Sequence, residues 1–261
     1  MPYYPPNFDR NRAIELGTLI DAAYTQYNNR TNAGFQWQPP GYQIVSVITA
    51  KEGLETVPFG YVAVKNQDVY VVIRGTQEAL EWLDDATIAP TPFHPGWGNT
   101  TKGFAAIYDQ LSPQILQEID KLKNQGAIGQ LFVTGHSLGA ALAHLATADL
   151  FISLGFKPIS YTFSGPRTGD PAFATAFDAN GLQTWRIFNT EDIVPTLPLA
   201  APDLTPTMQG LGDTMIELEL KLLIATHAVN QFQHLQTPIV ISFHKGTIAD
   251  NHNLTNLYRS L

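Results

Sequence analysis

The sequence contains no cysteine, which excludes disulfide bonds, cysteine-ligated zinc and thiol catalysis. Basic residues are also few, since 15 Lys and Arg stand against 23 Asp and Glu and leave a net charge of −8. With no basic cluster, nucleic acid is not an expected partner. No apolar run reaches transmembrane length, and the first residues lack the basic and apolar regions of a secretory signal. We therefore expect no transmembrane segment and either a cytoplasmic protein or the mature form of a secreted one.

The composition that remains is typical of one α/β domain. A chain of 261 residues, 44% hydrophobic and 15% charged, can bury a single large core, and we expect one domain over residues 1–261. Apolar residues at helical spacing predict helices over about 9–27, 102–124, 138–150 and 171–179. Apolar or alternating runs predict strands over about 42–50, 59–65, 68–74, 130–134, 158–164, 184–189, 216–222 and 238–244. Pro113 is expected to kink or divide the second helix.

The segment 130–141 combines a short apolar strand, a tight turn and an alanine-rich helix around the pattern Gly-x-Ser-x-Gly. On such a strained strand-to-helix turn the serine Oγ stands clear of the sheet. Gly135 and Gly139 are needed because the adjoining backbone leaves no room for a Cβ. The N–H groups at the start of the helix point to where an oxyanion would form. Ser137 is therefore the predicted nucleophile, and the alternative is an ordinary glycine-rich turn with an incidental serine.

A second oxyanion donor is expected at the end of an earlier strand. The run Val71–Arg74 turns through Gly75 to present Thr76, which supplies a backbone N–H and a hydroxyl. Hydrolases of this architecture take one donor from the residue after the nucleophile and another from the loop after this strand. We predict Leu138 N–H and Thr76 as these donors, with a simple helix-capping role for Thr76 as the alternative.

The acid and base of a triad should follow the serine in the order Ser, Asp, His. Asp192 lies just beyond the predicted strand 184–189 and is the preferred acid, because Glu191 would face the opposite side of an extended chain. Four histidines, at positions 227, 234, 244 and 252, follow in the required order. His252 lies in a polar loop from which it can reach the nucleophile, whereas His244 is expected within a strand. His252 is the predicted base, with His244 and His227 as alternatives.

A helical segment of one to two turns is predicted at 77–83, directly after Thr76. Its Leu80, Trp82 and Leu83 are more apolar than a surface helix beside a catalytic turn should carry. We interpret 77–83 as a lid whose apolar face covers the site and meets lipid, with core packing of the same side chains as the alternative. No metal or organic cofactor is expected, because the sequence has no HExxH or other metal-ligand spacing.

In this order, the segments resemble the class 3 lipases, the fungal-type triacylglycerol lipase family of α/β-hydrolases. The resemblance rests on residues 74–76, 82–85, 102–104, 135–140, 165–167, 192–195 and 251–252, with Tyr258 behind them. It implies an α/β-hydrolase fold with a mostly parallel central sheet, helices on both faces and a short lid. It also implies Ser137, Asp192 and His252 as the triad. The chain departs from the family at Thr101, where a histidine usually stands, and 222–237 has no recognisable match.

The expected function is carboxylic-ester hydrolysis through an acyl-enzyme, with a triacylglycerol lipase as the first choice. The predicted partner is a lipid or another ester, with a lipid–water interface among the candidate sites of action. Phospholipase or galactolipase A1-type activity is the close alternative, and a feruloyl-type esterase is a weaker one because such lids are usually more polar. A lipid-binding protein without catalysis is disfavoured, since every triad and oxyanion position is filled.

Overall fold

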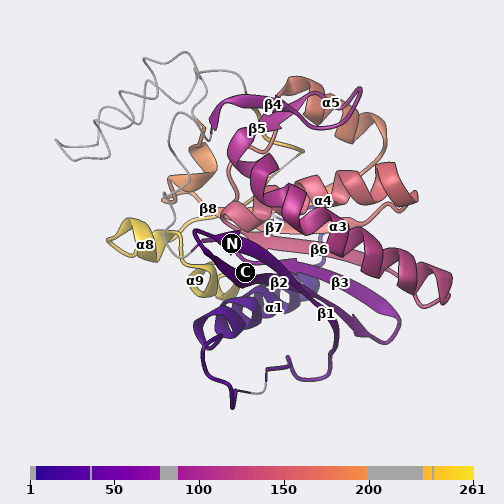
Figure 1. The fold of residues 1–261 in the computed structure, drawn as a ribbon. Coiled ribbons are helices and arrows are strands. Elements are labelled where there is room, and N and C mark those ends of the chain that lie inside the picture. The colour runs from indigo at the N-terminus through magenta and orange to yellow at the C-terminus, as the bar shows by residue number, and fades with distance from the viewer. Residues whose placement is uncertain (1–3, 36, 77–87, 199–231, 237) are drawn as a thin grey trace.

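A seven-stranded sheet forms the centre of the computed structural model, which describes residues 4–35, 37–76, 88–198, 232–236 and 238–261 (Figure 1). Its strand order is β1-β2-β3-β6-β7-β8-β9. The strands are β1 (Gln43–Glu52), β2 (Glu55–Lys65), β3 (Asp68–Ile73), β6 (Leu131–His136), β7 (Ile159–Phe163), β8 (Gln183–Asn189) and β9 (Pro238–Ile241). Pairing is antiparallel from β1 to β3 and parallel from β3 to β9. The predicted mostly parallel sheet is confirmed.

Helices cover both faces of this sheet, as predicted. The α-helices of the described residues are α1 (Arg10–Asn28), α3 (Lys102–Asn124), α4 (Leu138–Leu154), α5 (Pro171–Ala179), α8 (Ile248–Asn251) and α9 (Leu254–Arg259). Figure 1 shows α3 and α4 on one face and α1 with α9 on the other. The two faces have separate apolar clusters, one built on α3, α4 and α5 and the other on α1 and α9. A small hairpin, β4 (Pro90–Pro92) with β5 (Asn99–Thr101), lies outside the main sheet.

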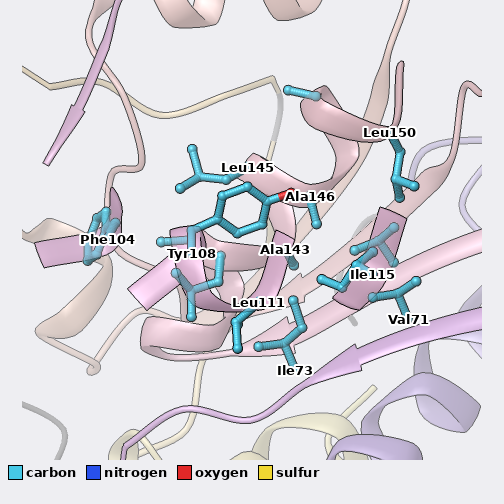
Figure 2. Close-up of a cluster of buried hydrophobic side chains, with 14 of the residues drawn as sticks. Val71, Ile73, Phe104, Tyr108, Leu111, Ile115, Ala143, Leu145, Ala146 and Leu150 are labelled. Carbon is cyan, nitrogen blue, oxygen red and sulfur yellow. The ribbon is translucent and has the colours of Figure 1, made fainter. Parts of the chain in front are cut away.

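The larger cluster joins the sheet to the helices that follow β5 and β6. Figure 2 shows Val71 and Ile73 of β3 packed with Leu111 and Ile115 of α3 and with small side chains of α4 such as Ala146. These five side chains are fully buried. Each large one stabilises the fold by about 1.5–3 kcal/mol relative to exposure. This packing fixes α4, and with it the turn that precedes it, against β3.

Local signals in the sequence explain where several elements begin and end. Asp9 caps α1 by accepting a hydrogen bond from the Arg12 N–H at 2.9 Å. Asn66 and Gln67 both have positive φ, at 51° and 72°, and form the tight turn between β2 and β3. Gly155 ends α4 in the left-handed conformation, with φ at 75°. These residues set the start of α1, the turn between β2 and β3, and the end of α4.

Two sequence-based expectations are wrong in detail. Pro113 does not divide α3, which runs through it without interruption. The last strand, β9, ends at Ile241, so His244 is not within a strand. His252 lies in the short connection between α8 and α9, as expected, and is the C-terminal cap of the four-residue helix α8. The predicted strand 216–222 and the predicted lid 77–83 lie outside the described residues. Within the described residues, no helix combines the length and apolar character that a membrane crossing requires.

Candidate active site

Ser137 occupies the turn between β6 and α4. Its backbone φ of 56° and ψ of −128° lie in a region that residues other than glycine rarely adopt. The strand delivers the chain to this turn through His136, and α4 begins directly afterwards at Leu138. The serine therefore stands at the helix N-terminus, where the backbone N–H groups of the first turn have no acceptor within the helix. This is the predicted strand–turn–helix geometry.

The two glycines of the motif are enforced by close backbone contacts. A Cβ on Gly135 would lie 2.0 Å from the carbonyl oxygen of Gly139. A Cβ on Gly139 would lie 2.5 Å from the Ile73 carbonyl oxygen and 2.4 Å from that of Arg74. No side chain fits at such distances, so the turn can press against the end of β3 only with glycine at both positions.

A buried acid–base pair lies at the same edge of the sheet. His252 Nδ1 is 2.8 Å from Asp192 Oδ2, and the side chains are 6% and 0% exposed. The second carboxylate oxygen, Oδ1, accepts a hydrogen bond from the Val194 N–H at 3.0 Å. Because an ionised carboxylate only accepts hydrogen bonds, His252 Nδ1 carries the proton in this contact. The opposite ring nitrogen, Nε2, is then left with a lone pair, as a general base requires.

Two buried atoms at this site have no hydrogen-bond partner among the described residues, and they are the ones that a Ser–His contact would join. Ser137 Oγ and His252 Nε2 are both unpaired there. The ring of His252 also lies against that of His136, the residue before the serine, with centroids 4.6 Å apart. The structure thus brings the three predicted triad residues to one edge of the sheet from three separate segments.

The alternative acid and base lie at the surface and contact each other. His244 Nδ1 is 3.6 Å from a carboxylate oxygen of Glu191, and the side chains are 71% and 46% exposed. Asp192 faces inward and Glu191 outward, as the extended-chain argument predicts. His234 Nε2 lies 2.6 Å from the Pro195 carbonyl oxygen. Because a carbonyl oxygen only accepts hydrogen bonds, His234 Nε2 donates in this contact. His227 lies outside the described residues.

The predicted oxyanion residues lie on the two sides of the serine. Leu138, fully buried, is the first residue of α4. Gly75 follows the end of β3, and a Cβ on it would lie 2.9 Å from the Ser137 Cβ, so the strand end touches the nucleophile turn. Thr76 comes next and is partly buried. The lid residues Leu80, Trp82 and Leu83 lie outside the described residues.

Two residues that the sequence interpretation did not place at the site are connected to it. The hydroxyl of Tyr24 on α1 accepts a hydrogen bond from the Gly75 N–H at 2.9 Å and lies 2.9 Å from His136 Nδ1. The other ring nitrogen of His136, Nε2, lies 2.9 Å from the carbonyl oxygen of His252. Burial lowers the pKa of His136 well below its ordinary value, and the neighbouring His252 lowers it further. The only signal in the sequence was a polar tip on the apolar face of α1.

Metal binding finds no support in the part of the chain that the structure describes. No group of three or more His, Asp or Glu side chains is arranged there to hold an ion. The polar atoms of the site are those of a serine, an imidazole and a carboxylate, which suit nucleophilic catalysis.

Comparison with known proteins gives a consistent result. The profile of the family described as Lipase (class 3) matches residues 70–201. The lipase of Rhizomucor miehei is 36% identical over 138 residues, which cover 51% of this chain and 38% of that protein. Phospholipase A1-II 1 of Oryza sativa subsp. indica is 32% identical over 194 residues, which cover 61% of this chain and 49% of that one. The chain thus spans less than half the length of these relatives.

Solved structures agree with this match over more of the chain. The triacylglyceride lipase of Rhizomucor miehei superposes with a TM-score of 0.61 at 28% identity, covering 74% of this chain and 77% of that one. A lipase from Rhizopus microsporus var. chinensis gives a TM-score of 0.60 at 25% identity. The described sheet and its flanking helices therefore have the α/β-hydrolase fold of these fungal lipases. With the profile match over half of its length, the chain belongs to the class 3 lipase family.

Proposed function

We propose that this protein is a serine carboxylic-ester hydrolase that acts on acylglycerols. The observation that carries the proposal is the buried Asp192–His252 contact of 2.8 Å, with His252 Nε2 and Ser137 Oγ left unpaired by the described residues. A buried carboxylate that fixes the tautomer of an imidazole beside a serine is the arrangement that nucleophilic acyl transfer requires. The roles of Ser137, Asp192 and His252 are part of this proposal.

The first step is attack on the ester. His252 Nε2 takes the hydroxyl proton of Ser137 as Oγ forms a bond to the carbonyl carbon, and the carbonyl π electrons move to the oxygen. Asp192 holds the imidazole in position and stabilises the imidazolium that results. The tetrahedral intermediate then collapses, and His252 returns the proton to the departing alcohol oxygen. The product is an ester between Ser137 and the acyl chain.

The second step reverses these roles with water as the nucleophile. His252 removes a proton from water, the hydroxide oxygen attacks the acyl carbon, and Ser137 Oγ leaves with the proton from His252. In both steps the carbonyl oxygen becomes negatively charged. Leu138 N–H and Thr76 are the proposed donors to it, and each such donor stabilises the transition state by about 3 kcal/mol.

Acylglycerols are the first proposed substrates, because the fungal relatives bear the name lipase and because Leu80, Trp82 and Leu83 are suited to an apolar interface. Phospholipid acyl esters are the second candidate, supported by the rice relative named phospholipase A1-II 1. The net charge of −8 disfavours adsorption to anionic membranes. A phospholipid substrate would therefore be presented best in zwitterionic vesicles.

The test is the rate of tributyrin hydrolysis followed through the solubility limit of this short-chain triglyceride. We expect hydrolysis that rises sharply once droplets appear and that is absent in Ser137→Ala. A fluorophosphonate probe should label the wild type and leave Ser137→Ala unlabelled. Smooth saturation below the limit would make the protein an esterase and remove the lid proposal for 77–83.

The same assay on phosphatidylcholine vesicles separates the two lipid substrates. Hydrolysis of vesicles without hydrolysis of tributyrin would replace acylglycerols by phospholipids. Failure of the fluorophosphonate to label the wild type, in a protein that remains folded, would overturn the hydrolase proposal itself.

A further inference from the structure

A chain of hydrogen bonds connects three backbone segments of the site through two side chains. It runs from the Gly75 N–H to the Tyr24 hydroxyl, then to His136 Nδ1, and from His136 Nε2 to the His252 carbonyl, with each contact at 2.9 Å. Gly75 precedes the proposed oxyanion residue Thr76. His136 precedes the proposed nucleophile, and His252 is the proposed base.

The chemistry of the two ends fixes the direction of every bond between them. A backbone N–H only donates, so Tyr24 Oη accepts from Gly75 and keeps its own hydrogen for another acceptor. A backbone carbonyl only accepts, so His136 Nε2 carries a proton and donates to His252. A neutral imidazole has one N–H, which leaves Nδ1 bare to accept the Tyr24 O–H. Every polar group is therefore paired in one arrangement only.

We propose that Tyr24 and His136 are positioning residues that hold the end of β3, the nucleophile turn and the backbone of His252 at fixed mutual distances. Neither side chain reacts with substrate in this proposal. They act through Thr76, Ser137 and His252, and their catalytic effect rests on the function proposed above. Small displacements of these groups matter because acyl transfer needs the reacting atoms and the oxyanion donors aligned within fractions of an ångström.

The packing around Tyr24 and the contacts of α1 with α9 also support this inference. A Cβ on Gly75 would lie 2.7 Å from both the Tyr24 hydroxyl and the His136 carbonyl oxygen, so the strand end, α1 and the turn are in close contact. One turn earlier on α1, Asp21 Oδ2 accepts hydrogen bonds from Thr255 at 3.0 Å and Tyr258 at 2.6 Å on α9. Helix α1 thus holds both the turn and the segment that follows His252.

Helix α1 is not part of the segment that matches the family profile, which begins at residue 70. The inference therefore assigns a catalytic effect to an element outside that match. The residue at position 136 must also offer one hydrogen-bond donor and one acceptor on opposite sides of a ring, which a neutral histidine does.

The test compares Tyr24→Phe with Tyr61→Phe, which is a matched control. The Tyr61 hydroxyl is buried and donates to the Leu19 carbonyl on α1 at 2.8 Å, so its loss removes one buried hydrogen bond to the same helix without touching the site. With p-nitrophenyl butyrate as substrate, we expect kcat of Tyr24→Phe to fall about tenfold or more, with KM changed by less than about twofold. Tyr61→Phe should keep kcat within about twofold of wild type.

A second measurement uses the wild type and does not depend on the folding of a variant. The ¹⁵N shifts of the His136 ring should show a neutral imidazole protonated at Nε2, since the His252 carbonyl only accepts a hydrogen bond. Protonation at Nδ1 in the wild type would overturn the proposal, as would equal kcat values for Tyr24→Phe and Tyr61→Phe. An inactive wild type with the expected tautomer would instead overturn the proposed function and leave the hydrogen-bond chain intact.

Discussion

At the scale of single residues, the site depends on which of two adjacent carboxylates turns inward. Asp192 has a fully buried side chain and contacts His252, while Glu191 is exposed and contacts His244. Chain order and the position after a strand were enough to predict the inward pair. The sequence did not predict that His252 caps a helix, because the four residues of α8 are too few to show a helical period.

The proposed oxyanion donor Thr76 provides a test at this scale. Thr76→Val keeps the shape and the backbone N–H but removes the hydroxyl. Because an oxyanion donor acts mainly in the transition state, we expect kcat to fall by about 100-fold with little change in KM. Steady-state kinetics with a soluble short-chain ester measures both constants.

A matched control for this substitution is Thr134→Val. The Thr134 hydroxyl is buried in β6 and donates to the Tyr161 carbonyl at 2.7 Å, so the variant loses a comparable hydrogen bond near the site. Its kcat should remain close to that of the wild type. A change confined to KM in Thr76→Val would show that Thr76 has an ordinary loop role.

At the scale of elements, the junction of β6 and α4 is held by backbone contacts that only glycine permits. Gly139→Ala would place a Cβ within 2.6 Å of the Ile73 oxygen and of the Arg74 carbonyl group. Helix α4 would have to move away from β3, so we expect the free energy of unfolding to fall by about 2 kcal/mol or more, with loss of activity. Urea unfolding measures the change.

The control for this prediction is Gly34→Ala in an exposed loop. A Cβ there would meet only Asn32 Oδ1, at 3.6 Å, which is an ordinary contact. The variant should change stability by less than about 0.5 kcal/mol. If Gly139→Ala were as stable as Gly34→Ala, the contact between α4 and the end of β3 would not be the reason for glycine in the motif.

The elements also show where local sequence signals are overruled. Pro113 lacks an N–H and was expected to kink or divide α3, yet the helix is not divided, and Leu111, Ile115 and Ile119 on both sides of it are fully buried. Their burial outweighs the lost hydrogen bond and keeps the helix continuous. Thr101 stands where the family usually has histidine, and it caps α3 by accepting a hydrogen bond from the Phe104 N–H at 3.1 Å.

At the scale of the whole molecule, the sequence indicated the strands of the sheet more readily than the contacts between elements that surround the proposed site. Strands β3, β6 and β7 are short and rich in β-branched and aromatic residues, which is typical of buried parallel strands. The Tyr24–His136 contact joins residues 112 positions apart on two elements. No local pattern encodes such a pairing, because it exists only once α1 has packed against the sheet.

Three buried or partly buried histidines of the molecule have lowered pKa values. Burial lowers the pKa of His144 to about 3 and that of His234 to about 2, with nearby Arg186 contributing in both cases. Burial likewise lowers the pKa of His136 well below its ordinary value. The two ring nitrogens of His144 form hydrogen bonds with the hydroxyls of Thr168 and Thr184, at 2.8 Å and 3.1 Å. Its lowered pKa keeps the ring neutral, with a proton on one nitrogen only.

These shifts predict that stability falls in mild acid. In the unfolded chain a histidine takes up its proton near pH 6.5, whereas the folded protein leaves these three neutral, so the unfolded state binds more protons below that pH. Stability is therefore unaffected above about pH 7 and is lost as the pH falls. Each histidine that stays neutral in this range removes about 2 kcal/mol between pH 7.5 and pH 5, against a usual total of about 5–15 kcal/mol.

Urea unfolding at a series of pH values from about 7.5 to 5 measures this loss, and two variants identify its source. The asparagine of His144→Asn cannot titrate. Near pH 5 the slope of its unfolding free energy against pH should therefore be smaller than that of the wild type by about 1.4 kcal/mol per pH unit, whatever its stability at neutral pH. His244→Asn, at a histidine that is 71% exposed, is the matched control for the same substitution at the surface. A wild-type stability that stays constant down to pH 5 would mean that these side chains accept protons without unfolding, and the interior would then be open to water at His144.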